Sequence, residues 1–509
     1  MFTFNLFRGK EKPQTKKIAM PRTQNKVLVD QKVEEFVGEL KTRSLGLVGD
    51  RIDQETEAGM IVGSINSAIK GSAYRLYNQG RHLALNTSVG ARYVQLTIDE
   101  VIGTGLQPKT FLMKGNEIDI KANAEIENLF WRWASSQRRF SRSGKLNFLE
   151  CLKLMEKERV MGGDAFLVLH QDGKDLQVTV YGADYVDWND QRTLEGGNVV
   201  YGGIEYDQDL KPQAYWFRKR DLFTQAFTTQ RYRVPAENVL HYFIPVQADA
   251  LRGCTDFLPV IKDITHMDAF RETSLIQKRV VASSMCFLEK PQNEKDEFEL
   301  DDEVDGIPYQ EREVITDFSP GTIQELPAGY TVKSVSASTT GDDFDKFNES
   351  VLTAISMGLS SYKTALTGDT STVNYSAAKF GRLMMANRFK GHQDRLIDTV
   401  IMPLFEAFLT HSVINSRLNI RMTQIENIML NMTVIRPKTE SIDAAKDISA
   451  DLMLIQNGLK SRSSVIVSRG EDPIQTFKEI EAERRYLNTF GENEGEQKPD
   501  SQIEQPDGG

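Results

Sequence analysis

The sequence predicts an α+β fold built from several parts, and three observations carry this prediction. The chain has 509 residues, more than one hydrophobic core usually holds, so we expect several domains or one long subunit. Apolar residues recur at helical spacing before residue 165, at a spacing of two in the next segments, and at helical spacing again after residue 256. Apolar residues make up 40% of the chain and charged residues 26%, which is typical of an ordinary water-soluble protein.

The N-terminal residues 1–40 are predicted to form a loose basic arm. They carry scattered Lys and Arg but no apolar stretch followed by small residues, so no secretory signal is indicated. No uninterrupted apolar run approaches the roughly 20 residues that cross a bilayer, and we therefore expect no membrane partner. The cysteines Cys151, Cys254 and Cys286 have no paired spacing. This predicts neither a disulfide nor a zinc site and favours a reducing compartment.

The charge balance limits how the chain can meet nucleic acid. Its formal net charge is −10, which argues against a general affinity for DNA, because such binding is driven by Lys and Arg that displace counterions from phosphates. Acidity does not exclude contact with DNA. A surface along which DNA slides would be poorly served by a basic lining, since each neutralised phosphate holds the duplex more tightly.

Residues 41–256 form one predicted α+β part, which starts with helices. A helical pattern ends at the glycines of VIGTGLQPK, and Thr87 or Ser88 is the expected N-cap of its last helix. The next helix has apolar residues at spacings of four and three, which puts them on one face: Ile126, Phe130 and Trp133. We interpret this face as buried packing rather than as a surface that stacks on bases, because amphipathic helices commonly have this pattern.

Strands follow from residue 165, where the period changes to two. Two strand-like runs flank Asp172 and Gly173, a pair of residues that strongly indicates a hairpin. One face of the second run consists of Leu176, Val178 and Val180. More strands are predicted in VVYGGIEYDQDLKPQAYWF and in RYRVPAENVLHYF.

A long helix is predicted to begin at residue 256 or 257, with Asp256 as its N-cap and Pro259 in its first turn. It would run for roughly thirty residues, or about 45 Å. Its apolar residues are Ile261, Ile264, Met267, Phe270, Ile276, Val280 and Val281. Its charged residues are Lys262, Asp263, Asp268, Arg271, Glu272, Lys278 and Arg279. Because the apolar residues form no single stripe, this helix requires neighbours on two flanks.

The remainder of the chain alternates linkers and helices. An acidic segment at 294–305 leads into short strands with turn signals at Pro320 and Pro327, and a helix follows over 343–359. The run LTGDTSTVNY then passes directly into a helix over 376–410, which Pro403 interrupts. Three further helical stretches follow residue 441, the first ending at Gly458, and the polar, acidic residues 491–509 are predicted to be disordered.

No motif in the sequence indicates catalysis or a cofactor. There is no GxxxxGK[ST] phosphate loop, no HExxH, no GxSxG elbow and no pair of histidines at ligand spacing. His241, in VLHYF, is interpreted as a packed core histidine. The acidic run at 294–305 is interpreted as solvated rather than as a cation cage, since it lacks the glycine and closing glutamate of a calcium loop. We therefore expect no cofactor, no metal, no enzyme activity and a structural or assembly role.

The order of several landmarks is more specific than any one of them. These are GGIEYDQDLKPQAYWF, RVPAENVLHYFIPVQADALRGCTDFLPVI, FSPGTIQELPAGYTV, ISMGLSSYKTALTGDTSTVNYSAAKFGR and IDAAKDISADLMLIQNGLKSRSSVIVSRGEDP. In this order, the chain resembles the lambda-like family of tailed-phage portal proteins over most of residues 60–485. The GDTSTVNYSAAK segment is the most specific of them, and the C-terminal helix-glycine-helix pattern is the weakest.

The resemblance implies a portal fold that assembles as a ring at one capsid vertex. In chain order its parts would be the arm over 1–40, a wing over 41–256, a first stem helix over 257–288, a clip over 289–342, a second stem helix over 343–360, a tunnel-loop region over 361–376, a long channel helix over 377–412, a return to the wing over 413–440, a helical crown over 441–490 and the tail over 491–509. The clip residues that dock a motor are left unassigned, because the acidic run has no motif to align.

Two sets of residues are expected to meet DNA if the resemblance holds. The tunnel loop would consist of Thr367, Gly368, Asp369, Thr370, Ser371, Thr372, Val373, Asn374 and Tyr375. Its short uncharged side chains can exchange hydrogen bonds with hydrated phosphates without the persistent ion pairs that Lys or Arg would make. The stem residues that could line the channel are Lys262, Arg271, Glu272, Lys278 and Arg279.

The implied partners follow from the same resemblance. They are other copies of the chain, in the family usually about twelve, double-stranded DNA bound without sequence preference, the terminase large subunit, the major capsid and scaffold proteins, and neck or adaptor proteins. The chain would act in the virion after assembly in the host cytoplasm, and DNA would pass through the ring during packaging and ejection. The alternatives are another virion ring, such as a neck adaptor or baseplate component, and, less favoured, a packaging ATPase or nuclease.

Overall fold

Most of the elements expected from the changes of period are present in the computed structural model of the chain. It describes residues 64–114, 117–282, 286–289, 331–334, 341–369, 371, 375–437 and 444–489. The chain divides into two compact units, 1–72 and 73–509, and helix α2 (Ile65–Asn86) begins in the first and ends in the second. The basic arm, the acidic run at 294–305 and the acidic tail lie outside the described residues, so these three predictions stay predictions.

The helices that precede the first sheet confirm the predicted capping and packing. Helix α3 (Ser88–Val101) has Thr87 as its N-cap, whose hydroxyl accepts a hydrogen bond from the Gly90 amide. Helix α4 (Ile120–Ala134) buries the face predicted from its spacing: Ile126, Phe130 and Trp133. Helices α5 (Gln137–Phe140) and α6 (Phe148–Gly162) follow, and Asn147 and Glu150 form a capping box at the start of α6.

The aromatic core on one side of the wing gathers around Phe130. Its ring lies 5.0 Å from that of Phe405 and 5.4 Å from that of Phe408, both on α11 (Met402–Ile414). The Phe148 ring lies 5.6 Å away, in an edge-on arrangement. Such pairs add stability beyond the area that they bury. Residues far apart in the sequence therefore close one core, and helix α11 packs against helix α4 of the part predicted as the wing.

Two antiparallel sheets complete the wing. Strands β4 (Asp164–His170) and β5 (Gln177–Gly182) form the predicted hairpin, and β11 (Val239–Phe243) pairs with the other edge of β4. The five-stranded sheet has the order β10-β9-β8-β7-β6. Its strands are β6 (Arg192–Thr193), β7 (Val199–Tyr201), β8 (Ile204–Tyr206), β9 (Pro212–Arg220) and β10 (Phe227–Pro235). Buried side chains from both sheets meet between them: Phe166, Val168, Val186, Ile204, Tyr206, Tyr215, Phe217 and Val239.

The fully buried Arg252 ties these sheets together. Its guanidinium pairs with Asp164 at 2.8 Å and donates to three backbone carbonyls: Ala183, Val186 and Gly202. Asp164 also receives hydrogen bonds from His241 and from the Gly253 amide. Burial raises the pKa of Asp164, but the Arg252 charge and the His241 contact outweigh it and hold that pKa below its usual range. His241 is packed against this carboxylate, which confirms the interpretation of this residue.

The long helix predicted after residue 256 is shorter than expected. A single 3-10 turn, η3 (Leu258–Val260), contains Pro259 and leads into α7 (Ile261–Ala282). Cys286–Glu289 is strand β12, paired with β13 (Thr331–Ser334). The expected extent of 257–288 was therefore wrong at its end. The cause is local, because the aromatic and apolar residues of CFLE suit a strand.

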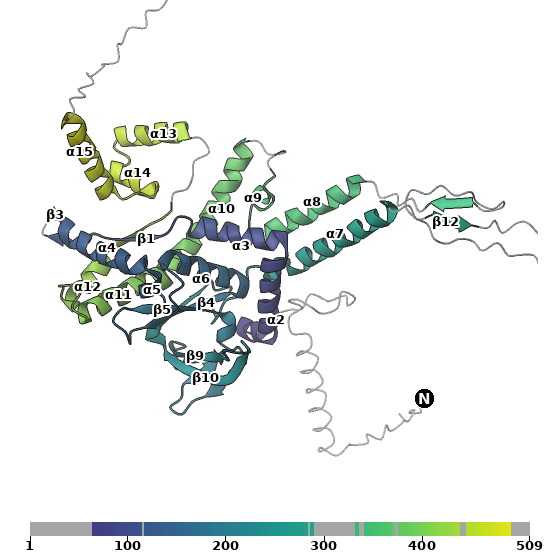
Figure 1. Cartoon of the computed structure of the whole chain (residues 1–509), viewed down its shortest axis with the longest axis horizontal. Helices are drawn as coiled ribbons and strands as arrows, with labels where there is room; N and C mark the ends of the chain where they lie inside the picture. The colour runs from purple at the N-terminus through teal and green to yellow at the C-terminus, as the bar shows by residue number, and fades with distance from the viewer. Residues whose placement is uncertain are drawn as a thin grey trace, which may run out of the picture. The chain divides into compact units, whose positions relative to one another are not determined.

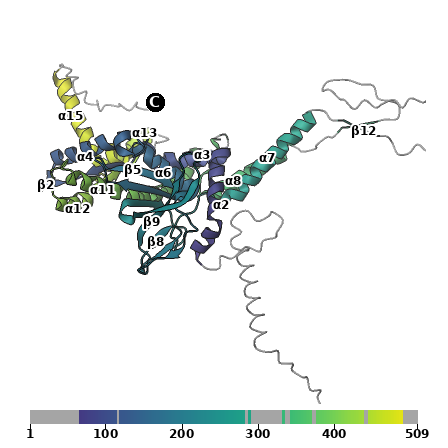
Figure 2. The same ribbon diagram turned by 60° about the horizontal axis from the view of Figure 1, so that its bottom comes forward.

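Helix α8 (Gly341–Gly358) returns beside α7, and the two lie side by side in Figures 1 and 2. They run antiparallel, since Gly358 lies against Val260 at one end while Phe344 and Phe347 contact Phe270 further along. Val260 and Gly358 are so close that a Cβ on the glycine would lie 2.4 Å from the valine side chain. Two antiparallel helices thus occupy the positions predicted for the stem helices, and their role as a stem stays a prediction.

The helix predicted over 376–410 continues through Pro403 instead of breaking there. Helix α10 (Tyr375–Leu396) passes through one π-helical turn, η4 (Ile397–Ile401), into α11. Proline has no N–H and its ring clashes with the carbonyl four residues earlier, so wider hydrogen-bonded turns before it relieve that conflict. Lys379–Ile414 is long and apolar enough to span a bilayer by those two criteria alone. Core helices meet the same criteria, and 44% of its apolar window is buried.

The C-terminal elements return to the wing before they form the last group of helices. Helix α12 (Met422–Leu430) precedes β14 (Met432–Ile435), which pairs with β1 (Gln107–Thr110). A short hairpin consists of β2 (Met113–Lys114) and β3 (Glu117–Ile118). The final helices are α13 (Ala444–Gln456), α14 (Arg462–Ser468) and α15 (Pro473–Thr489). Gly458, with φ of 68°, follows α13 and confirms the predicted stop.

One ion-pair cluster joins the last helices to the wing. The ammonium of Lys109, on β1, lies 2.9 Å from carboxylate oxygens of both Glu127 and Asp472. Burial lowers the pKa of Lys109, but the two carboxylates outweigh burial and raise it overall. Lys109 therefore stays charged at neutral pH and binds the start of α15.

Candidate functional site

The segment predicted to be a tunnel loop contains a short helix, α9 (Lys363–Thr367). Leu366 is buried, and the Ala365 carbonyl accepts a hydrogen bond of 3.1 Å from Arg92 on α3. Gly368 ends the helix with φ of 73°, and its amide donates to the Thr364 carbonyl. A left-handed glycine is a common way to end a helix. The irregular part of the loop therefore begins at residue 368, later than the predicted start at 361.

The described residues of this loop hydrogen-bond to one another. The Thr367 hydroxyl donates to the Lys363 carbonyl and accepts from the Asp369 amide. The Asp369 carboxylate accepts from the Ser371 amide at 2.9 Å. The Ser371 side chain and backbone hold the pKa of Asp369 below its usual range. Thr367 and Asp369 thus shape the turn, which sequence reasoning did not foresee.

The other predicted loop residues are only partly placed. Thr370, Thr372, Val373 and Asn374 lie outside the described residues. Tyr375 is the first residue of α10. Only a few residues separate the end of α9 from the start of α10. The predicted polar loop is therefore followed directly by a helix.

The connection from α8 to α9 lies against α10. The Ser361 hydroxyl is 3.8 Å from the sulfur of Met385, and the Tyr362 ring packs on Gly381 so closely that a Cβ there would lie 2.5 Å from it. Arg388 donates hydrogen bonds to the carbonyls of Leu359 and Ser360. The second stem helix, the loop and α10 are therefore joined by direct contacts.

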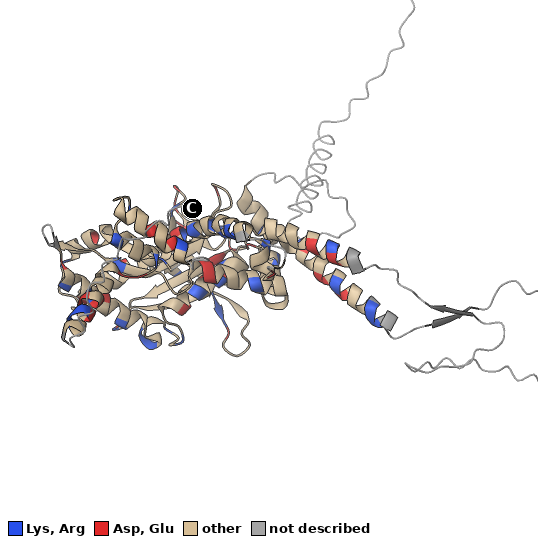
Figure 3. Ribbon diagram, turned by 90° about the horizontal axis from the view of Figure 1, so that it is seen from above, with Lys and Arg blue, Asp and Glu red and all other residues tan. Residues whose placement is uncertain are grey.

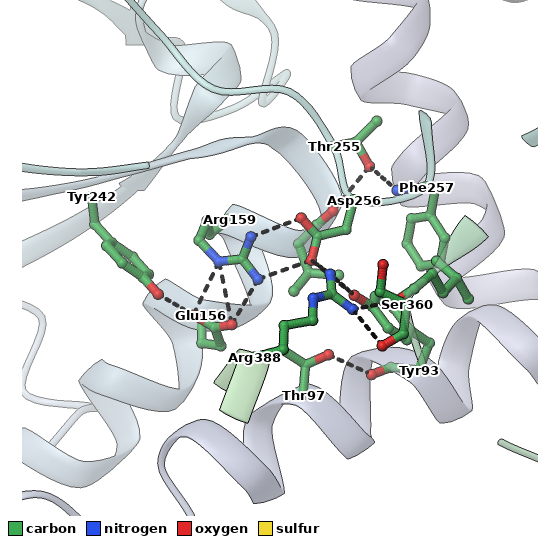
Figure 4. Close-up of polar contacts among 12 residues, drawn as sticks. Tyr93, Thr97, Glu156, Arg159, Tyr242, Thr255, Asp256, Phe257, Ser360 and Arg388 are labelled. Atoms are coloured by element: carbon green, nitrogen blue, oxygen red, sulfur yellow. Dashed lines mark hydrogen bonds and ion pairs between the residues drawn. The ribbon is translucent and has the colours of Figure 1, made fainter. Parts of the chain in front are cut away.

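A buried polar cluster surrounds Arg388 and lies where α3, α6, η3 and α10 meet (Figure 4). Asp256 accepts hydrogen bonds from Arg159 at 2.8 and 3.0 Å and from the Tyr93 hydroxyl at 3.0 Å. Arg388 reaches the Tyr93 hydroxyl at 3.1 Å and approaches Asp256 at 4.0 Å. We call these residues, with Glu156 and Tyr242, the junction cluster.

The inner end of the junction cluster is closed by Glu156. Its carboxylate pairs with Arg159 at 2.7 Å and accepts a hydrogen bond of 2.7 Å from the Tyr242 hydroxyl. Arg159 thus bridges two carboxylates, Glu156 and Asp256, in the interior. A buried arginine is stabilised in this way only when its donors are satisfied by well-placed acceptors. The cluster links helix α6 of the wing to the residue that precedes the stem.

The pKa shifts in the cluster show how the charges support one another. Burial raises the pKa of Asp256, yet the Arg159 charge and hydrogen bonds outweigh burial and hold that pKa below its usual range. For Arg159, the carboxylates overcome burial and raise its pKa. Burial first, and the Arg159 charge second, lower the pKa of the neighbouring His392 to about 4. His392 is accordingly neutral at pH 7, beside a cluster of fixed charges.

The assignment of Asp256 as a helix N-cap was therefore wrong. Its backbone amide bonds to the Val160 carbonyl, and its carboxylate is held by Arg159 and Tyr93. A charge-assisted pair with a guanidinium is stronger than an ordinary cap, so the distant arginine determines where the carboxylate points. A sequence signal for it exists, because Glu156 and Arg159 lie on the same apolar face of α6 as Leu152 and Met155.

The five predicted stem residues do not form one group. Arg271 donates to the Asn348 side chain of α8 at 3.1 Å, and the Lys278 ammonium lies 5.2 Å from the centre of the Phe344 ring. The others, Lys262, Glu272 and Arg279, are exposed. Basic and acidic residues alternate along both helices rather than gathering on one side (Figure 3). Two of the five therefore hold α7 to α8.

The apolar residues of α7 differ in burial along its length. Ile261, Ile264 and Met267, near the wing, are buried. Further out, Leu275 is 49% exposed and Ile276 is 52% exposed. Phe347 on α8 is exposed as well, although it contacts Phe270. The outer stem thus keeps apolar surface uncovered, as a helix that requires further neighbours would.

Among the described residues, no group of three or more His, Cys, Asp or Glu side chains could hold a metal ion. Cys151 and Cys254 are free thiols, and burial raises the pKa of both. Buried thiols of raised pKa are poor nucleophiles.

Comparison with known proteins identifies the family. Residues 54–393, well over half of the chain, match the family described as "Phage portal protein, lambda family". The chain belongs to the lambda family of phage portal proteins. This confirms the resemblance, and it makes the chain a structural component of the virion with the function of a portal protein. The family is structural rather than catalytic.

A curated relative agrees with this assignment. The chain is 22% identical over 436 residues to the "Probable portal protein" of Halomonas phage phiHAP-1, covering 82% of this chain and 81% of the relative. Similar solved structures include "Neck of native GTA particle computed with C12 symmetry", with 14% identity and a TM-score of 0.41, and "Virion of native gene transfer agent (GTA) particle", with 13% identity and a TM-score of 0.42. Both cover 79% of this chain and 94% of the solved chain. The family assignment rests on the sequence match.

Proposed function

We propose that about twelve copies of this portal chain form a ring, with their stem helices packed side by side and their loops at 367–375 facing double-stranded DNA. The DNA would pass through the ring during packaging and ejection. The observation that carries this proposal is the contrast within α7, where apolar residues are buried near the wing and exposed further out. Packing against the stems of two neighbouring copies would cover this surface.

The hydrophobic effect gives this arrangement its driving force. Leu275, Ile276 and Phe347 all have large exposed side chains on the described part of the stem. Covering apolar surface contributes roughly 25 cal/mol per Å², and a ring repeats the gain at every interface. The charges beside these residues, including Lys262, Glu272 and Arg279, are then left for the rim and the lumen. We propose that some of them line the channel, together with Arg271 and Lys278.

The loop supports contact with DNA without tight binding. It carries no Lys or Arg between residues 364 and 378, so it cannot form ion pairs with phosphates. Asp369, whose pKa is lowered, is negatively charged at neutral pH and repels them. Hydroxyl and amide side chains can exchange weaker hydrogen bonds with hydrated phosphates. A duplex could therefore slide past the loops with low resistance.

The family role also sets the partners that we propose. The clip, which includes β12 and β13, would bind the terminase large subunit during packaging and neck or adaptor proteins later. The wing would contact the major capsid and scaffold proteins, and the last three helices would form the crown. Assembly would take place in the host cytoplasm. Family membership favours a portal over a neck adaptor or baseplate ring.

The ring is tested by electron microscopy and mass measurement of the purified full-length chain. We expect an annular particle with an open bore about as wide as a duplex. Ile276→Asp should reduce the mass to that of single chains while the helical content is kept. The control Leu222→Asp alters a more exposed leucine at the tip of the β9–β10 hairpin and should still form rings. A chain that stays single under all conditions that support virion formation would overturn the proposal, as would ATP hydrolysis or DNA cleavage by the chain alone.

A further inference from the structure

The four residues that connect the second stem helix to α9 follow α10 in a fixed order. The carbonyls of Leu359 and Ser360 bind Arg388, the Ser361 hydroxyl lies against Met385, and the Tyr362 ring covers Gly381. As the connection advances from 360 to 362, its partner on α10 moves back from 388 to 381. The connection therefore runs antiparallel to α10.

The three partners on α10 share one face. Gly381, Met385 and Arg388 are separated by four and three residues, which places them above one another on the helix. We call these three residues the docking track. The same spacing continues to His392, which lies beside the junction cluster. The track thus leads from the start of the loop helix to the buried charges that precede the stem.

Each contact along the track has a different chemistry, so the connection fits in only one position. A Cβ at residue 381 would lie 2.5 Å from the Tyr362 ring, and therefore only glycine leaves room for it. Arg388 offers donors that match two adjacent carbonyls. A shift by one turn would put the tyrosine ring against Met385 and leave the Leu359 carbonyl, which belongs to a buried residue, without its donor.

The backbone of the connection is held in an uncommon conformation at this point. Ser360 has φ of 46°, in the left-handed region that residues other than glycine rarely adopt. Such a conformation persists only where the surrounding contacts determine it. Here those contacts are the hydrogen bond from Arg388 to the Ser360 carbonyl and the one from the Ser361 amide to the Ser356 carbonyl.

Arg388 is the member of the track that also binds the wing. Its second terminal nitrogen donates to the Tyr93 hydroxyl and approaches Asp256 at 4.0 Å. One guanidinium, carried by the helix that follows the loop, therefore contacts Tyr93 on α3 and the residues after the second predicted stem helix, and it approaches the residue before the first.

We propose that Arg388 is a positioning residue that fixes where the loop at 367–375 begins, by holding the connection at 359–362 in register on the docking track. The DNA-facing part of this inference rests on the proposed function. The register itself does not, because it follows from contacts within one chain. A change at the track should move the loop without unfolding the wing.

The inference is tested by hydrogen exchange of the full-length chain as Arg388→Gln, Arg388→Lys and Gly381→Ala. In Arg388→Gln, amides of residues 359–368 should exchange at least about tenfold faster, as expected when a charge-assisted hydrogen bond is lost. Gly381→Ala should give the same local change through a steric cause, and Arg388→Lys a smaller one. Strands β4 and β5 should exchange as in the parent chain.

The matched control is Arg382→Gln, which removes the same charge from the same helix away from the track. It should leave exchange at 359–368 unchanged. Equal acceleration in β4 and β5, or no acceleration at 359–368 in both Arg388→Gln and Gly381→Ala, would overturn the inference. The DNA content of particles assembled with each variant tests the proposed function separately. If exchange at 359–368 changes but the particles still contain their full amount of DNA, the inference about Arg388 is supported and the DNA-facing role of the loop is refuted.

Discussion

The parts predicted as the wing and the stem differ in how many of their side chains find partners within the same chain. In the wing, even the buried guanidiniums of Arg159 and Arg252 find carboxylates and carbonyls within the same chain. In the outer stem, Leu275 and Ile276 stay exposed. Among the described residues, the part predicted as the wing thus pairs its buried charges within one chain, whereas the part predicted as the stem leaves apolar surface that the proposed ring would cover. Four experiments test this contrast.

The largest effect is expected in the wing. Arg252→Met leaves Asp164 charged and buried without its main partner and leaves three carbonyls without a donor, which should lower the free energy of unfolding by about 4 kcal/mol or more. Urea denaturation measures the change. The control Arg142→Met breaks an exposed pair with Asp172 and should cost less than about 1 kcal/mol. Similar losses at both positions would contradict a self-sufficient wing core.

The second experiment compares two isoleucines of one helix. Ile264→Ala removes a fully buried side chain and should cost about 2 to 5 kcal/mol in the dissociated chain. Ile276→Ala, at a half-exposed position, should change that value by less than about 0.5 kcal/mol but should weaken ring assembly. Unfolding is followed by circular dichroism and assembly by light scattering. Equal costs in the dissociated chain would remove the distinction between inner and outer stem.

A pH titration addresses the boundary between the two regions. His392 has a pKa of about 4 in the folded chain, whereas its ordinary value is 6.5. Between these two pH values His392 is therefore protonated in the unfolded chain but neutral in the folded chain. Stability should therefore fall as the pH decreases from about 6.5 to 4, by about 2 to 3 kcal/mol from this residue. Burial lowers the pKa of His241 as well, which adds in the same direction.

The variant His392→Leu isolates this contribution. It should flatten the dependence of unfolding free energy on pH between 6.5 and 4, whereas His266→Leu, at an exposed stem position, should leave the slope unchanged. Asp164 and Asp256 have lowered pKa values, so their contributions are lost only at more acidic pH. A slope as steep in His392→Leu as in the parent chain would mean that the boundary is not acid-sensitive at this residue, because the His241 contribution remains in both.

The smallest effect is expected at the loop. Gly368 has φ of 73° and open space around its Cβ position, so Gly368→Ala should cost only the conformational strain, about 1 kcal/mol. Gly391, within α10, also has open space around it. Gly391→Ala should stabilise the chain by about 0.5 to 1 kcal/mol because alanine favours a helix. Thermal unfolding distinguishes the two signs, and a neutral result at both positions would show that the loop conformation is not fixed.

Much of the fold could be predicted because its signals are local. The hairpin at Asp172 and Gly173, the cap at Thr87, the stop at Gly458 and the buried face of α4 each depend on a few neighbouring residues. The family could be recognised from the order of several such segments. These predictions succeeded because period and turn chemistry are properties of the chain itself.

The junction cluster could not be predicted, since its partners are distant in the sequence. Asp256 and Arg159 are 97 residues apart, and Arg388 and Tyr93 are 295 apart. A local rule assigned Asp256 to a cap, and a stronger distant contact holds it elsewhere. The hydroxyls of the predicted loop were likewise expected to be available for hydrogen bonds with hydrated phosphates. The Thr367 hydroxyl instead makes its hydrogen bonds within its own turn.

The π-helical turn at Ile397–Ile401 has a consequence for protein engineering. Such a turn accommodates one more residue than an α-helical turn, and each residue corresponds to about 100° of rotation. Deleting a single residue from it would leave an α-helical turn and keep the aromatic face of α11 toward Phe130, whereas deleting a residue from a regular turn of α10 would rotate that face by about 100° relative to the docking track. Insertions and deletions in this helix should therefore be tolerated only where they keep the angle between the docking track on α10 and the aromatic face of α11.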